Sequence, residues 1–187
     1  MLTRRGLVLG GGGITGIAWE LGFLLSLLEA GLPLQENTAV LGTSAGSVTG
    51  TLLTTRSESE LHHRLEHLVD FEVTSRLARG ALLGALPNLL LPGRASAKRV
   101  TLAAQATRAH PGTGRKRHQA IRRRLDVTVW PEADLRITAV NGATGELTVF
   151  TRDSGVDIND AVAASCAVPF VWPPVQIQGT PYIDGAV

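Results

Sequence analysis

The feature that most constrains the fold is a pair of short apolar segments, each ended by glycines and followed by a helical pattern. Residues 6–9 run into four consecutive glycines and an apolar-rich helix expected over residues 16–30. Residues 38–42 run into GTSAG and a second helix expected over residues 45–55. Such units are typical of a parallel sheet covered by helices. We predict a three-layer α/β sandwich with a mainly parallel central sheet. A doubly wound nucleotide-binding fold shares these units and is the alternative.

Beyond residue 56 the pattern becomes helical before strands return. Ser57 and Glu60 form a capping-box pattern that starts a helix. We expect residues 57–125 to form a helical cap inserted within a single domain that spans residues 1–187. Strand-like segments follow at residues 134–140 and 146–151, and Asp157 starts a short helix. The chain has 44% apolar and 18% charged residues, which indicates a globular protein.

The candidate signal sequence and the candidate membrane-spanning segment both depart from the patterns that such segments need. Cys166 is the only cysteine, so no intrachain disulfide can form. An N-terminal signal sequence is disfavoured because four glycines and Glu20 interrupt the apolar run after Arg4 and Arg5. The apolar residues 81–91 are too few to span a bilayer. We therefore expect a cytoplasmic protein that is at most peripheral to the membrane.

Ser44 is the candidate nucleophile. It stands between Gly42 and Gly46, after an apolar strand and before a helix. In a nucleophile elbow, flanking glycines permit a sharp turn, and the serine hydroxyl projects over the sheet. The alternative is that Ser44 only caps the helix that follows it.

The glycine-rich turn before the first helix allows two interpretations. Gly11, Gly13 and Gly16 match the dinucleotide-binding pattern, which also needs an acidic residue at the end of the second strand. Glu36 precedes that strand instead, so nucleotide binding is disfavoured. The backbone N–H groups of such a turn can alternatively stabilise a developing oxyanion.

The proton acceptor for Ser44 is sought at a strand end over the sheet. Asp184 ends a strand-like segment and is followed by Gly185. The histidines lie in a helical or a basic segment, where a solvated surface position is expected; they are His62, His63, His67, His110 and His118. Asp184 is therefore the better candidate.

Four motifs in fixed order carry a family resemblance: GGGITG, GTSAG, ASCAVPFVWPPV and DGA. Together they resemble the patatin-like phospholipases over nearly the whole chain. The resemblance implies a Ser–Asp dyad without histidine, metal or cofactor, with Ser44 as nucleophile and Asp184 as base. It also implies an oxyanion hole at Gly11, Gly12 and Gly13. The glycines that would support the motifs are Gly16, Gly42, Gly46 and Gly185.

The resemblance implies hydrolysis of fatty-acyl esters of lipids, of the phospholipase A, lysophospholipase or carboxylesterase type. It also suggests that residues 168–175 wall an acyl pocket. Two departures stand out. Thr15 occupies a position where the family commonly has arginine, and the chain stops three residues after Asp184, as if the C-terminal part were absent. A catalytically impaired lipid- or anion-binding module on the same fold is therefore the alternative function.

A basic cluster lies in the second half of the segment 57–125. Such a cluster is either a solvated face or a contact for anionic lipid head groups. Nucleic acid is not expected as a partner, because only Trp130 lies near as a stacking aromatic residue. The cluster consists of Arg115, Lys116, Arg117, Arg122, Arg123 and Arg124.

Overall fold

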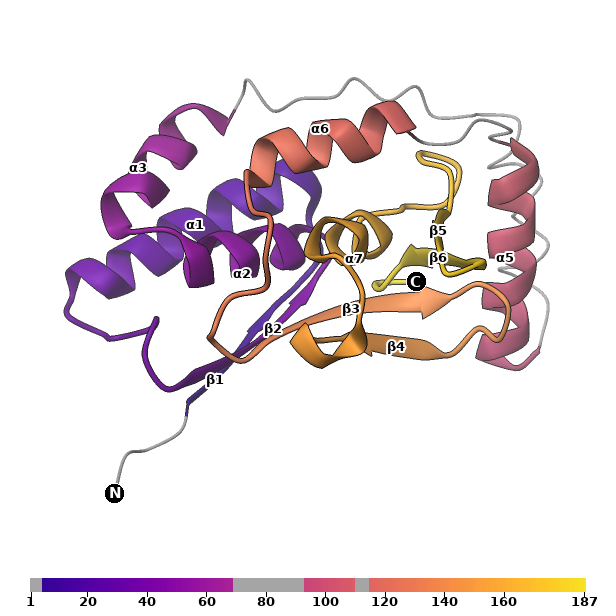
Figure 1. The fold of residues 1–187 in the computed structure, drawn as a ribbon, viewed down its shortest axis with the longest axis horizontal. Helices are drawn as coiled ribbons and strands as arrows, with labels where there is room; N and C mark the ends of the chain where they lie inside the picture. Colours follow the sequence, from indigo (N-terminus) through magenta and orange to yellow (C-terminus); the bar gives the residue numbers. More distant parts are fainter. Residues whose placement is uncertain (1–4, 69–92, 110–114) are drawn as a thin grey trace.

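The computed structural model describes residues 5–68, 93–109 and 115–187 of the chain, and these form a six-stranded sheet with helices packed on it (Figure 1). The strands are β1 (Arg5–Leu9), β2 (Thr38–Thr43), β3 (Leu135–Asn141), β4 (Leu147–Phe150), β5 (Val175–Ile177) and β6 (Thr180–Asp184). The helices are α1 (Gly13–Glu29), α2 (Ala45–Thr55), α3 (Glu58–Glu66), α5 (Ala95–Ala109), α6 (Arg115–Leu125) and α7 (Ile158–Ser165), with a 3-10 turn, η2 (Arg152–Ser154).

The sheet is mixed. β1, β2 and β3 are parallel neighbours, as the two strand–helix units at the N-terminus predict. β4 and β6 both pair antiparallel with β3, and β5 pairs antiparallel with β6. The parallel part therefore extends from β1 to β3, and the C-terminal strands complete the sheet in the opposite direction.

Two strands share one edge of β3, and this arrangement positions the site. Thr138 of β3 pairs with Thr43 of β2, and the next residue, Ala139, pairs with Asp184 of β6. β4 pairs with both Thr138 and Ala139 along the other edge. Since a strand has only two edges, β2 and β6 lie one after the other on the same edge. Because one runs parallel and the other antiparallel to β3, their C-terminal ends meet.

Helices cover both faces of the sheet, which confirms the three-layer α/β prediction. Ile137 and Ala139 of β3 lie in the main buried cluster, where α2 and α7 pack on the sheet and α1 packs on α2. Val140 alternates to the opposite face, where it lies in a second cluster with Ala103 of α5 and Ile183 of β6. Figure 1 shows α5 standing at the end of the sheet near β5 and β6.

The segment between β2 and β3 contributes α3, α5 and α6. α3 begins at the predicted capping box, in which the Ser57 N–H donates to Glu60 Oε2 at 2.8 Å. α3 packs on α1, and α6 packs on α7. Whether this segment acts as a cap stays a prediction, and the apolar residues 81–91 lie outside the described residues. Among the residues described, no helix is both long and apolar enough to cross a bilayer.

Candidate active site

The turn at Ser44 has the geometry of a strained strand-to-helix connection. Ser44 separates β2 from α2 and has a φ of 53°, which is uncommon for a residue with a side chain. A Cβ on Gly42 would lie 2.4 Å from the Gly46 carbonyl oxygen, so only glycine fits there. The Ser44 hydroxyl makes no capping hydrogen bond to α2. Ser44 is thus the N-cap residue of α2 by position, but its side chain does not cap the helix.

The backbone of this turn is held by side chains from two helices. The Ser44 N–H donates to Ser165 Oγ at 2.8 Å, at the end of α7. The Ser44 carbonyl accepts hydrogen bonds from Ser47 Oγ at 2.7 Å and from Cys166 Sγ at 3.2 Å. These bonds hold a strained residue in place, as a preorganised nucleophile requires.

Asp184 lies at the meeting point of β2 and β6. Asp184 is 2% exposed and Ser44 is 8% exposed, so both residues are buried. The Ala186 N–H donates to Asp184 Oδ1 at 2.8 Å, and the Asp184 N–H donates to the Ala167 carbonyl at 3.0 Å. The first bond orients the Asp184 carboxylate, and the second holds the end of β6 in place.

A pair of threonines links the end of β2 to β3, next to the place where β6 ends. Thr43 and Thr138 lie side by side, and their hydroxyl oxygens are 2.6 Å apart. A Cβ on Gly185 would lie 2.5 Å from Thr138 Oγ1 and 2.7 Å from the Thr138 carbonyl oxygen, so the chain after Asp184 is fitted closely against this pair. The residues before Ser44 and after Asp184 therefore contact the same point on β3.

The glycine turn lies beside both groups. A Cβ on Gly11 would lie 3.7 Å from the Ser44 Cβ and 3.5 Å from the Ala186 Cβ. Gly10 anchors the turn by accepting a hydrogen bond from the Gly46 N–H at 2.8 Å. α1 begins at Gly13, so the turn stands at the positive end of a helix and presents exposed backbone to the site. The predicted Ser44, Asp184 and glycine-turn positions are thus brought together.

The family model for patatin-like phospholipases matches residues 7–187. The chain belongs to the patatin-like phospholipase family. The match includes the glycine turn, the Ser44 elbow and the Asp184 motif.

Among solved structures, the crystal structure of VipD from Legionella pneumophila is similar, with a TM-score of 0.57 and 19% sequence identity. The match covers 98% of this chain but only 46% of VipD, so this patatin-like chain spans less than half the length of that protein. At this identity the likeness supports the fold alone. No curated protein sequence matches the chain.

Glu20 is a component of the patatin-like site that sequence reasoning missed. It lies in α1 at 7% exposure and accepts hydrogen bonds from the Gly10 N–H and the Thr49 hydroxyl. Burial raises the pKa of its carboxyl, and the two hydrogen bonds partly oppose that rise. Glu20 therefore binds the start of the glycine turn, through the Gly10 N–H, from its position on α1. The available signal was one acidic residue within the apolar stretch GIAWELGFLL.

Ser165 and Cys166 were also missed as contacts of the elbow. The Cys166 thiol contacts the Ser44 carbonyl, as described above. The signal was their place in the ASCAVPFVWPPV motif. They directly precede Ala167, whose carbonyl accepts a hydrogen bond from the Asp184 N–H.

The histidines that the structure describes have partners elsewhere. His62 Nε2 lies 3.1 Å from Glu29 Oε1, and His118 Nε2 lies 2.6 Å from Asp160 Oδ1. His63 and His67 stack on each other, with ring centroids 4.2 Å apart. These contacts agree with the prediction that the histidines lie away from the chemistry; His110 is outside the described residues.

The basic cluster on α6 is partly engaged within the protein. Arg122 forms an ion pair with Asp157 at 3.2 Å, at the start of α7, whereas Arg123 is exposed. Trp130 donates its indole N–H to the Val156 carbonyl at 2.7 Å, so its polar edge is occupied. The side chains of the remaining members lie outside the described part; these are Arg115, Lys116, Arg117 and Arg124.

Proposed function

We propose that the chain is a serine acyl hydrolase of lipid esters, with Ser44 as the nucleophile and Asp184 as the base. The observation that carries the proposal is the meeting of β2 and β6 on one edge of β3. The Ser44 elbow follows one strand end, and the buried Asp184 carboxylate forms the other. A nucleophile and its base must lie within hydrogen-bond reach, and this topology supports such contact.

The proposed reaction has two half-reactions. Asp184 accepts the Ser44 proton as Ser44 Oγ attacks the ester carbonyl, and it then donates that proton to the departing alcohol. Water, deprotonated by Asp184, next attacks the acyl-enzyme, and Asp184 returns that proton to Ser44 Oγ as the fatty acid is released. No histidine takes part in either step.

The backbone N–H groups of Gly11, Gly12 and Gly13 are proposed to stabilise the oxyanion. A carboxylate is a weak base for a hydroxyl group, so much of the rate must come from these donors. Loss of one oxyanion donor typically lowers kcat by about 10²–10³. The turn stands beside Ser44 at the N-terminus of α1, where the helix dipole favours negative charge.

A fluorophosphonate probe tests the proposal, because it labels only an activated serine. The parent protein should be labelled and should hydrolyse short- and long-chain acyl esters, and Ser44→Ala should lose both properties. Asp184→Asn should lose turnover with an unchanged thermal unfolding temperature. Ser26→Ala is the matched control, because the Ser26 hydroxyl bonds only its own helix, donating to the Gly22 carbonyl. The histidine controls His62→Ala and His118→Ala should keep activity.

Two results would contradict the proposal in different ways. A folded parent protein without labelling or turnover would favour the non-catalytic lipid- or anion-binding module. A histidine variant as damaging as Asp184→Asn would replace the dyad with a triad.

We further propose that α6 contacts anionic lipid surfaces. Arg123 is exposed on this helix, next to Arg122 in sequence, and a peripheral enzyme meets its substrate in an aggregate. This contact would bring the proposed site to the lipid surface.

A further inference from the structure

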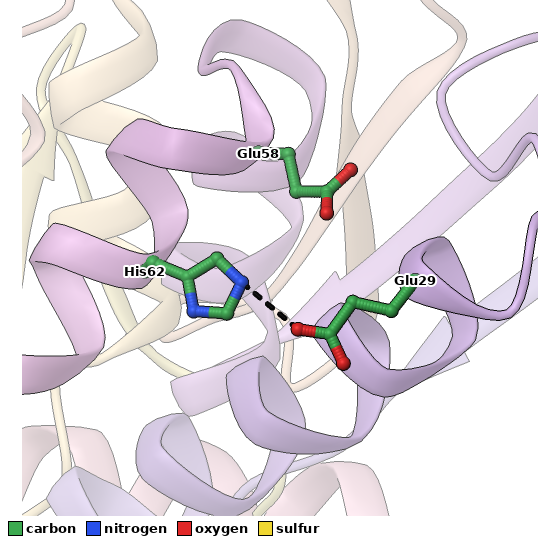
Figure 2. A group of neighbouring side chains, drawn as sticks. All are labelled: Glu29, Glu58 and His62. Carbon is green, nitrogen blue, oxygen red and sulfur yellow. Dashed lines mark ion pairs between the residues drawn. The ribbon is translucent and has the colours of Figure 1, made fainter.

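A second group of chemically competent side chains lies far from Ser44. Glu29 is the last residue of α1, Glu58 is the first residue of α3, and His62 follows Glu58 by one helical turn. Figure 2 shows the three side chains converging from the two helices. At 1.5 Å rise per residue, Glu29 is about 24 Å along α1 from the glycine turn. The cluster is therefore separate from the proposed active site.

The geometry brings three potential ligand atoms together. One donor atom from each residue lies within 4.8 Å of the other two, and Glu29 Oε1 is 3.1 Å from His62 Nε2. Glu58 and His62 are four residues apart, so they project from the same face of α3. Glu29 reaches them from α1, which packs against α3.

The backbones that carry these side chains are already held in place. Leu61, between Glu58 and His62, is fully buried in the main core. The Ser57–Glu60 capping box sets the first turn of α3, where Glu58 lies. A ligand would therefore have to order only side chains, which lowers the entropic cost of binding.

The charges of the cluster favour a divalent cation. Two carboxylates carry two negative charges, and a protonated His62 would balance only one of them. A divalent ion balances both and leaves the imidazole neutral, which is its ligand form. A set of one imidazole and two carboxylates suits Zn²⁺, whereas Ca²⁺ and Mg²⁺ prefer oxygen donors alone.

The distances fit this ion after small side-chain movements. Zn²⁺ binds nitrogen and oxygen at about 2.0–2.2 Å, which places the donors of a tetrahedral site roughly 3.3 Å apart. The 3.1 Å separation between Glu29 and His62 is already near that value. Their side chains are 55% and 44% exposed, so they are free to rotate closer to Glu58.

We propose that Glu29, Glu58 and His62 form a binding site for a divalent transition-metal ion, best matched by Zn²⁺, that links the end of α1 to the start of α3. A fourth position would remain for water. The bound ion would fasten α3 to α1, against which it packs.

Calorimetric titration of the metal-free full chain with ZnCl₂, and separately with MgCl₂, tests the proposal. The parent for this experiment is His67→Ala, because His63 of α3 stacks on His67, the residue that ends this helix, and the two form a competing pair. We expect one equivalent of Zn²⁺ to bind and to raise the unfolding temperature, and we expect MgCl₂ to do neither at the same concentration.

The ligand variants decide between a site and a simple ion pair. His62→Ala and Glu58→Gln, in the same parent, should each weaken Zn²⁺ binding by more than the roughly 10–100-fold that loss of an outer-shell partner costs. His63→Ala and Glu66→Gln are matched exposed controls on α3 and should bind as the parent does. Absence of Zn²⁺ binding, or binding that both ligand variants retain, would overturn the proposal. Unchanged circular dichroism would exclude unfolding as the cause of any loss.

Discussion

Replacement of Gly46 by alanine gives the sharpest test of how the elbow is built. A Cβ at this position would lie 2.2 Å from the Leu9 carbonyl oxygen and 2.4 Å from the Leu9 carbonyl carbon. Ordinary contacts begin at 3.4 Å, so β1 and α2 would have to separate by about 1.2 Å. Leu9 cannot swing aside, because it is paired with Gly42 in the parallel ladder.

The expected cost combines strain and displacement. Overpacking of this kind typically costs about 1–3 kcal/mol, which corresponds to about 2–12 °C in Tm for a chain of this size. The same movement would stretch the 2.8 Å bond from the Gly46 N–H to the Gly10 carbonyl and would shift the glycine turn from Ser44. A misplacement of about 1 Å can lower kcat by about 10²-fold.

The assay combines thermal unfolding with hydrolysis of a soluble nitrophenyl ester. Gly46→Ala should lower both Tm and kcat. Gly22→Ala is the matched control, because its Cβ would lie 4.0 Å from Leu65 Cδ2 of α3, an ordinary van der Waals contact. That variant should gain about 0.5–1 kcal/mol from helix propensity and keep its kcat. If Gly46→Ala retained the parent Tm and kcat, the close approach of β1 and α2 would not matter and the reasoning would fail.

Three further predictions follow from the same structure. Burial raises the pKa of Glu20, so the folded state holds the carboxyl proton more tightly than the unfolded state does. The free energy of unfolding of the parent, relative to Glu20→Gln, should therefore fall as pH rises above 4.5, the ordinary carboxyl value, and level off above the folded-state pKa. Urea unfolding across pH measures this difference. Gly185→Ala would press a Cβ against Thr138, and its kcat should fall at least about tenfold, with esterase assays as the measure and an unchanged kcat as the contradiction. Arg123→Gln should weaken sedimentation with anionic vesicles about fivefold, from about 1 kcal/mol per basic residue, but not with zwitterionic vesicles; equal binding to both by the parent would contradict the membrane proposal.

The local part of the fold could be predicted from the sequence because local rules set it. The helix expected at residues 45–55 is α2, and the capping box and the helix after Asp157 are both confirmed. The turn at Ser44 could be located because glycines that permit close backbone approach stand at fixed spacing around it. Such signals lie within a few residues of the structure that they specify.

The rest depended on contacts between distant segments. β5 lies just after a Pro-rich run that hides its strand pattern, and it was not predicted. The placement of β6 on the same edge of β3 as β2 follows from strand pairing, which no local pattern encodes. The contacts of Glu20 with Thr49 and of Cys166 with the Ser44 carbonyl were not predicted for the same reason, since each joins segments that are distant in the sequence.

The meeting of β2 and β6 on one edge of β3 has a consequence for how activity arises during synthesis. The two proposed catalytic residues are separated by 140 positions, so bringing them together closes a long loop. Contacts of high sequence separation form late, because loop-closure entropy must be overcome first. During N-to-C synthesis the Ser44 elbow can form before β6 exists, but its base cannot. A nascent chain would therefore carry an inert serine, and the proposed ester cleavage would begin only when β6 docks on β3.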